Sequence, residues 1–334
     1  MKNKMVAKNL LVLLILGGLL VLCFILNISF GPVNIPPSEL WQILMGDDSK
    51  GHMTLIVWQV RLPRSIAALF VGMALAAAGT ILQAVMQNPL AAPSLIGVNS
   101  GAGLMAMFVL AFLPGHMGLV VPATFIGALF ALFLTFLIAG GGRFERTTLV
   151  LGGVAVSAIL GAGVDTIRLL RPEAMIGATT FMIGGFAGTV WSSLGFALPW
   201  LVTALLLSLC SGPLLNVLSL GDEIALSLGV PVRISRLMLL TLAAVLAGSS
   251  VAIAGLLSFV GLIVPHAARF LTGNDQRWLM PVAMLFGGSF VLACDLAARM
   301  LFSPYELPVG ILLSFLGGPF FIFLLLRNRR EERL

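Results

Sequence analysis

Apolar stretches about as long as a membrane-spanning helix recur along the whole chain. Hydrophobic residues make up 59% of its 334 positions and charged residues only 10%, whereas a soluble domain has roughly 45–50% apolar and 25% charged residues. A helix needs about 20 apolar residues to cross a bilayer. Breaking the sequence at its polar and Gly/Pro-rich segments gives ten candidate spans: 9–29, 64–84, 95–113, 118–140, 147–167, 194–216, 236–255, 257–271, 279–298 and 307–326. We therefore predict an all-α polytopic membrane protein with about ten transmembrane helices, forming one transmembrane domain over residues 1–334.

Two segments depart from the pattern of regular spans. The eighth, 257–271, is short for a bilayer and contains Pro265, so we expect an irregular or partly buried element surrounded by protein rather than lipid. Residues 168–195 are too polar and glycine-rich to span. We expect them at the outer mouth, as a re-entrant turn.

The basic residues predict how the chain is oriented. With the N-terminus inside, thirteen of the nineteen basic residues lie in inner segments and six in outer ones, as expected for both termini in the cytoplasm. The six outer residues are Lys50, Arg61, Arg64, Arg168, Arg171 and Arg299. This orientation raises a question about the arginines, because basic residues are disfavoured on the outer side.

Several kinds of chemistry find no support in the sequence. The four lysines, at positions 2, 4, 8 and 50, exclude a GxxxxGK[ST] phosphate loop, so the chain cannot bind ATP by that route. The basic residues are scattered without interleaved aromatic residues, which argues against nucleic-acid binding. The three cysteines and three histidines stand apart from one another, so we expect neither a metal site nor a catalytic site.

A secondary carrier working alone is a different possible class. Such a carrier usually keeps ionisable groups near the membrane midplane to bind its coupling ion. Asp165 and Asp295 are the acidic residues expected within spans, and both fall near outer ends. This argues against an ion-coupled carrier, and a structural or signalling membrane protein is a third alternative.

Four stretches resemble the permease subunits of ATP-driven (ABC) importers for iron chelates, haem and cobalamin, the FecCD-type family. They follow the family's order and spacing over most of residues 61–326. In chain order they are RLPRSIAALFVGMALAAAGTILQAVMQNPLAAPSLIGVNSGAG, GDEIALSLGVPVRISR, AGLLSFVGLIVPHAARFLTG and CDLAARMLFSPYELPVGILLSFLGGPFFIFLLL. The resemblance implies a type II ABC importer permease fold, with ATP and Mg bound by a separate ATPase subunit. Many relatives have Arg where this chain has Gln87.

The second stretch, residues 221–236, is the longest charged connection expected on the cytoplasmic side. Two short helical pieces, 222–228 and 232–237, joined by Gly229 and Pro231, would form a compact knob. The resemblance implies that this cytoplasmic coupling loop docks into a groove on the ATPase; the alternative is a solvated loop. The residues implied in coupling are Gly221, Asp222, Glu223, Ala225, Leu228, Gly229 and Arg233.

The resemblance also offers a reason for the outer arginines. Arg61, Arg64 and Arg299 match residues that pair with acidic groups on an external substrate-binding protein, and a guanidinium suits such bidentate contacts. The alternative is that they reach lipid phosphates.

Thr147 and Thr148 are candidates for a cytoplasmic gate, or simply helix-entry residues.

The resemblance implies a complete transporter in a bacterial cytoplasmic membrane. Its partners would be two ATP-binding subunits, an extracytoplasmic substrate-binding protein and a second permease subunit, identical or homologous, with a pathway lined by the fifth and tenth spans. We expect a ferric siderophore as cargo. Cobalamin or haem is the alternative, because the stretch MIGGFAG is similar to corrinoid-type members.

Overall fold

Long apolar helices form almost the whole molecule. The computed structural model describes residues 2–31, 33, 35–46, 51–139, 146–303 and 305–331. By length and composition, seven helices in this part can cross a membrane, and three shorter apolar helices coincide with the other predicted spans. The seven are α1 (Lys2–Ser29), α4 (Leu62–Val85), α6 (Val120–Ala139), α7 (Arg146–Leu170), α9 (Trp191–Cys210), α12 (Val232–Ala254) and α14 (Gln276–Met300), and the three are α5 (Val98–Phe112), α13 (Val260–Thr272) and α15 (Val309–Glu331). The all-α polytopic fold predicted from the sequence is confirmed.

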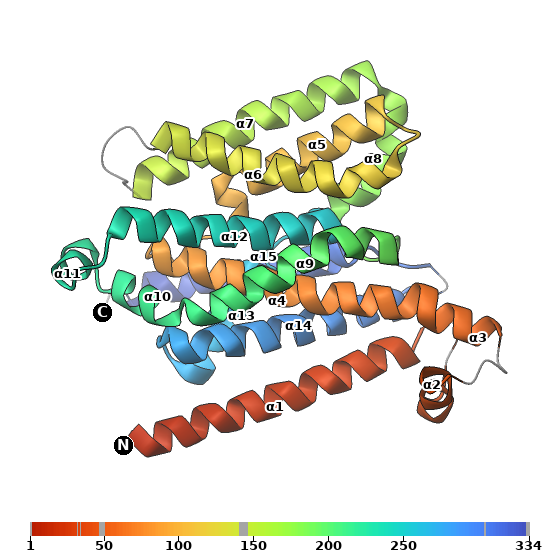
Figure 1. Ribbon diagram of the computed structural model, residues 1–334, viewed down its shortest axis with the longest axis horizontal. Helices are drawn as coiled ribbons and strands as arrows, with labels where there is room; N and C mark the ends of the chain where they lie inside the picture. The colour runs from red at the N-terminus through yellow and green to blue at the C-terminus, as the bar shows by residue number, and fades with distance from the viewer. Residues whose placement is uncertain are drawn as a thin grey trace.

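Helix α4 is the centre of the bundle. It packs against α14, α12, α13 and α9, and 19 of its 24 residues are buried. A layer of α5, α6 and α7 lies beyond α12, while α1 packs along the outer side of α14 (Figure 1). A span buried on nearly all sides fits the mostly apolar composition of α4, which is rich in alanine and glycine.

Two glycines of α4 permit its close approach to neighbouring helices. A Cβ atom added at Gly79 would lie 1.8 Å from the carbonyl oxygen of Gly261 in α13, and one added at Gly72 would lie 2.4 Å from that of Gly287 in α14. Helices that pack in lipid use small residues at such crossings, because little hydrophobic driving force holds them together there. The spacing of small residues in this span therefore reflects helix packing.

The helix of the eighth predicted span starts only after a break in the chain, and Pro265 lies inside that helix rather than at the break. The chain leaves α12 at Gly255 (φ 70°), passes through Phe259 (φ 67°) and only then begins α13. Helix α8 (Met175–Ile183) reaches this break, where the Leu256 amide donates to the Phe181 carbonyl at 3.0 Å. The non-helical backbone is thus hydrogen-bonded to protein, which lipid could not do. Helix α8 lies within the segment 168–195, whose re-entrant placement stays a prediction.

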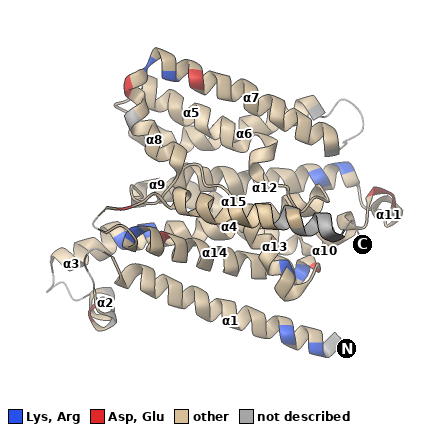
Figure 2. Ribbon diagram, turned by 180° about the vertical axis from the view of Figure 1, so that it is seen from behind, with Lys and Arg blue, Asp and Glu red and all other residues tan. Residues whose placement is uncertain are grey.

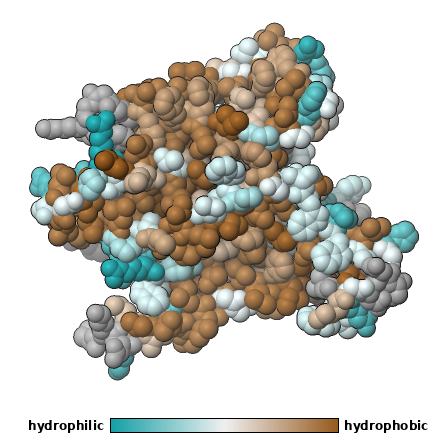
Figure 3. Space-filling view, viewed as in Figure 1, coloured by the Kyte–Doolittle hydropathy of each residue, from teal (hydrophilic) through white to brown (hydrophobic). Residues whose placement is uncertain are grey.

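Charged side chains gather at the two ends of the bundle. Figure 2 shows a belt of uncharged residues between these ends, and the face in Figure 3 is largely hydrophobic across the same belt. One end carries Arg61, Arg64 and Arg299 and is called here the arginine end; the other carries α11 (Asp222–Ser227) and the start of α1 and is called the α11 end. The remaining short helices are α2 (Pro37–Leu44), α3 (His52–Leu55), the π-helical Ile56–Arg61, α10 (Gly212–Ser219) and the 3-10 turns Pro93–Ile96, Met117–Leu119 and Pro172–Ala174.

Candidate functional sites at the two ends of the bundle

Two arginines at the arginine end bind the last carbonyl groups of α1. Arg61 donates to the carbonyl oxygens of Ile28 at 2.6 Å and Ser29 at 2.9 Å, and Arg299 donates to that of Asn27 at 2.8 Å. The last carbonyls of a helix have no partner within the helix, and basic side chains near its C-terminus satisfy them favourably. Arg61 and Arg299 therefore fix the end of α1 to α4 and α14.

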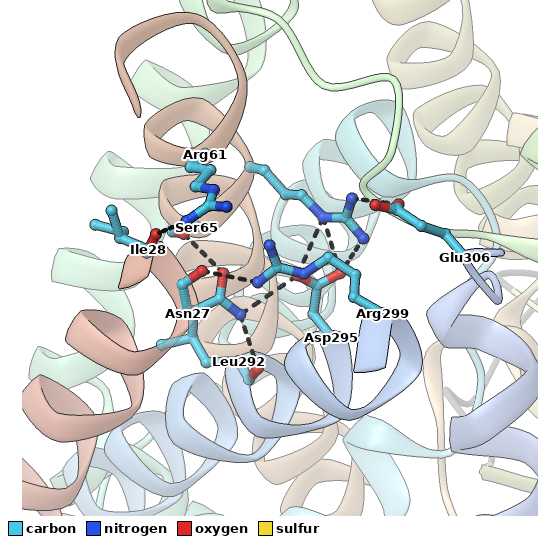
Figure 4. A network of polar contacts seen from close by, with 9 residues as sticks. Asn27, Ile28, Arg61, Ser65, Leu292, Asp295, Arg299 and Glu306 are labelled. Carbon is cyan, nitrogen blue, oxygen red and sulfur yellow. Dashed lines mark hydrogen bonds and ion pairs between the residues drawn. The ribbon is translucent and has the colours of Figure 1, made fainter. Parts of the chain in front are cut away.

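The third arginine, Arg64, is bound to carboxylates (Figure 4). Its Nε and Nη2 atoms donate to Asp295 at 2.9–3.2 Å, and Nη1 donates to Glu306 at 2.7 Å. Arg299 Nε also lies 3.5 Å from Asp295. Asp295 is thus the anion shared by two arginines, and the bidentate geometry gives the contact with Arg64 both direction and strength.

Asn27 completes the network from α1. Its amide nitrogen donates to the Leu292 carbonyl at 2.9 Å and to Asp295 at 3.3 Å, and its oxygen accepts from Ser65 at 2.8 Å. Sequence reasoning did not single out Asn27 or Glu306. The available signal was a polar residue, Asn27, inside the apolar run of the first predicted span, two residues before that span ends.

The arginines are enclosed rather than presented on an open rim. Arg61, Arg64 and Arg299 are only 4%, 6% and 3% exposed in the chain on its own. The sequence could not show that Asn27, Asp295 and Glu306 would converge on them. Two of the guanidinium groups, Arg64 and Arg299, contact the carboxylates of Asp295 and Glu306. Arg61 binds carbonyl groups instead, so this cluster of five charged residues carries one positive charge in excess. Contact with an external binding protein stays a prediction.

The other two outer arginines differ in their surroundings. Arg168 pairs with Asp165 at 3.0 Å and Arg171 with Glu173 at 3.4 Å, and all four side chains are at least 38% exposed. Pairs in this setting are solvated and contribute little. They provide matched controls for the buried network.

At the opposite end, the 221–236 segment forms a protruding turn around α11. Gly221 (φ 109°) and Gly229 (φ 79°) bound the helix in conformations that favour glycine, and Ala225 is its buried residue. Ile224, Leu226 and Leu228 are 48%, 60% and 60% exposed. The knob therefore presents apolar side chains where a solvated loop would be expected to present polar ones.

An ion pair anchors this knob to α12. Arg236, whose side chain is 3% exposed, donates through both terminal nitrogens to Asp222, one contact measuring 2.9 Å. Glu223 and Arg233 are exposed. The predicted separate piece over 232–237 is wrong: these residues are the first turns of α12, because nothing after Pro231 interrupts the helix. Arg236, which anchors the knob to α12, was not among the residues that the sequence implied in coupling.

The candidate gate residues lie at the start of α7. Thr147 is exposed and Thr148 half-buried, one and two residues after the helix begins at Arg146. Their position is that of helix-entry residues at the α11 end (Figure 1), and a gating role stays a prediction.

Gln87, at the position where many relatives have Arg, donates to the Leu218 carbonyl at 2.9 Å and so ties the 86–92 connection to α10.

A cavity of about 560 Å³ lies beside the first turns of α15. Its lining includes Ile311, Ser314 and Phe315 of α15, Met182 of α8 and Ser258 of the break after α12, and none of its lining residues is charged. The tenth predicted span, α15, thus lines the cavity, and its role as a pathway helix stays a prediction. The described lining takes nothing from α7, the fifth span.

The bundle, its broken helices and its two polar ends define a multi-pass membrane permease. The chain matches the FecCD transport family over residues 19–327. It is 38% identical to a hemin transport system permease protein from Yersinia pestis (96% of this chain, 97% of the relative) and 38% identical to an iron(3+) dicitrate transport system permease protein from Escherichia coli (92% and 95%). It is also 38% identical to a vitamin B12 import system permease protein from Klebsiella pneumoniae (93% and 92%).

A solved structure has the same fold. An ABC transporter described as of metal-chelate type, in an inward-facing conformation, superposes with a TM-score of 0.84 at 30% identity, covering 94% of this chain and 98% of that one. The chain belongs to the FecCD transport family, and it is a permease subunit of an ABC importer.

Proposed function

We propose that this permease imports a metal chelate across a bacterial cytoplasmic membrane, working with two ATP-binding subunits, an external binding protein and a second permease subunit. ATP and Mg are bound by the ATP-binding subunits, in which hydrolysis occurs. The observation that carries the proposal is the unlike chemistry of the two ends of the bundle. One end exposes apolar side chains on an anchored knob, and the other holds a buried cluster of three arginines with two carboxylates.

The α11 end suits an intracellular protein partner. Ile224, Leu226 and Leu228 stand on a short helix held by the Asp222–Arg236 pair, and buried apolar anchors dominate the affinity of protein interfaces. Movement of a bound ATPase would be transmitted through this pair to α12, as in rigid-body switching. Lys4 and Lys8 at the start of α1 lie at this end, which favours a cytoplasmic placement.

The arginine end suits an acidic partner on the other side. The excess positive charge of the network attracts carboxylates and favours their encounter with the correct orientation. In this proposal Arg61 and Arg299 mainly support the site, because their donors already bind α1, and Arg64 presents the exchangeable contact.

We propose a ferric siderophore as the cargo, with haem or cobalamin as the alternative. Three relatives named for hemin, iron dicitrate and vitamin B12 share the same 38% identity with this chain, while an iron(3+)-hydroxamate permease of Bacillus subtilis is 36% identical. An uncharged cavity lining suits passage of a bulky chelate without tight binding, since affinity would reside in the binding protein.

Uptake into proteoliposomes tests the proposal. The permease is reconstituted with the ATP-binding subunit and binding protein of its transport system, and radiolabelled ferric siderophore, haemin and cobalamin are offered separately. We expect uptake of the siderophore only when both partners and ATP are present. Uptake by the permease alone would favour a secondary carrier. Preferential uptake of haemin or cobalamin would identify a different cargo but leave the assignment as an ABC importer permease unchanged.

A further inference from the structure

Arg64 binds two carboxylates whose surroundings differ. Asp295 is 1% exposed and accepts three hydrogen bonds from Arg64, at 2.9, 3.1 and 3.2 Å. The side chain of Glu306 is 33% exposed and accepts a single bond at 2.7 Å. A partly exposed, singly bonded carboxylate exchanges more readily than a buried, bidentate one. Asp295 is therefore the fixed ligand of Arg64, and Glu306 is the one that can leave.

Glu306 belongs to the short connection between α14 and α15. The next residue, Leu307, donates its amide to the Ala298 carbonyl at 3.2 Å, and α15 begins at Val309. One residue into the helix, the Gly310 amide donates to the Gly184 carbonyl at 3.1 Å. The bond between Arg64 and Glu306 adds a side-chain link from α4 to the connection that leads into α15.

The first turns of α15 also line the cavity. Gly310, Ile311, Ser314 and Phe315 contribute to the lining of the 560 Å³ cavity. Glu306 is four residues before Gly310, so the bond made by its carboxylate restrains the helix that borders the cavity. A change at Arg64 can therefore reach the cavity wall through one ion pair and four residues of chain.

We propose that Glu306 is a displaceable ligand of Arg64 that couples docking to the cavity. A carboxylate of the external binding protein replaces Glu306 on the guanidinium, Glu306 turns to solvent, and the start of α15 loses this side-chain restraint and becomes more mobile. This inference rests on the proposed function. One carboxylate replaces another on the same cation, so little free energy is needed, and a partner can shift such an equilibrium by its preference for the released state.

The exchange predicts the sign of a mutational effect. In Glu306→Gln the charged competitor is gone, so the binding protein should bind the assembled transporter in nanodiscs about three- to fivefold more tightly, the effect expected from one partly exposed ion pair. Surface plasmon resonance measures this affinity. Glu306→Asp, with a shorter carboxylate, should change the affinity in the same direction by less. Glu173→Gln is the matched control, because Glu173 is an exposed partner of Arg171 at 3.4 Å, and it should leave the affinity unchanged.

A second readout reports on the cavity itself. A cysteine at Ser314, in a background with the exposed Cys210 replaced by serine, is labelled with a membrane-impermeant maleimide in the assembled transporter. We expect the binding protein to accelerate labelling of the otherwise unchanged chain several-fold. Glu306→Gln should be labelled at the faster rate without the binding protein, and adding it should produce no further increase.

Two results would overturn the exchange while leaving the transport proposal intact. They are an unchanged or weaker affinity in Glu306→Gln, or labelling that responds to the binding protein in that variant as it does in the unmodified chain. A binding protein that fails to bind the unmodified transporter would instead remove the proposed docking and, with it, this inference. If Glu306→Gln does not assemble, Glu306→Asp decides between the same outcomes.

Discussion

The two ends of the bundle use arginine and carboxylate pairs in opposite ways. At the arginine end, Asp295 is enclosed with Arg64 and Arg299, and all three are at most 6% exposed. At the α11 end, the Arg236 side chain is buried but the Asp222 side chain is 42% exposed, and apolar residues beside it face outward. The first arrangement locks three helices together, whereas the second fixes the base of a surface that stays open. Similar residue pairs thus differ in how firmly they are held, because Asp295 is enclosed and Asp222 is partly open to solvent.

The largest expected effect follows from removing the buried anion. Asp295→Asn leaves Arg64 and Arg299 without their shared carboxylate, and breaking a buried pair in this way costs about 3–5 kcal/mol. We expect a large loss of thermal stability in detergent and a lower yield of folded protein. Asp165→Asn is the control, because its 72% exposed side chain pairs with Arg168 at the surface. Equal stability of the two variants would show that the arginine end is not locked.

The second effect concerns the packed middle that joins the two ends. Gly79→Ala places a methyl group 1.8 Å from the Gly261 carbonyl oxygen, so α4 and α13 must separate, at a cost of about 1–3 kcal/mol. Gly18→Ala in α1 meets nothing within 4 Å and should be neutral or slightly stabilising. Thermal unfolding of both variants measures the difference. A stable Gly79→Ala variant would contradict the close crossing.

The third effect should appear in assembly and not in stability. Leu226 is 60% exposed on α11, so Leu226→Glu should leave the melting temperature unchanged. Burial of the new charge should weaken binding of the ATP-binding subunit about tenfold or more. Leu226→Met keeps the apolar contact and serves as control. Normal assembly of Leu226→Glu would mean that the exposed leucine is not part of the interface.

The smallest effect comes from repeating the Asp→Asn change at the α11 end. Asp222→Asn weakens a pair whose carboxylate side chain is 42% exposed, so solvent screening limits the loss to about 0.5–1 kcal/mol. The shift should shrink at high salt, since exposed charges are screened. The two Asp→Asn variants are compared by thermal unfolding over a range of ionic strength. A loss at Asp222 as large as that at Asp295 would remove the distinction between the ends.

The sequence predicted the helices better than the contacts between them. Long apolar runs determine spans directly, so the ten segments, the short eighth element with Pro265 and the packing role of Gly72 and Gly79 could be foreseen. The network around Asp295 could not, because Asn27, Arg64 and Glu306 are separated by 37 to 279 positions in the chain and meet only after α1, α4 and α14 pack. The start of α12 was predicted too late in the chain for a local reason. Pro231 directly precedes the helix, whereas the sequence pattern suggested a break between two short helical pieces.

Site-specific photocrosslinking in the assembled transporter tests the difference between the ends most directly. A photoreactive residue is placed at Leu226 on the α11 knob and, separately, at Tyr305, which is 79% exposed and adjoins Glu306. We predict that position 226 crosslinks to the ATP-binding subunit alone and that position 305 crosslinks to the external binding protein alone. Crosslinking of both positions to the same partner, or to the opposite partners, would contradict the assignment of the two ends.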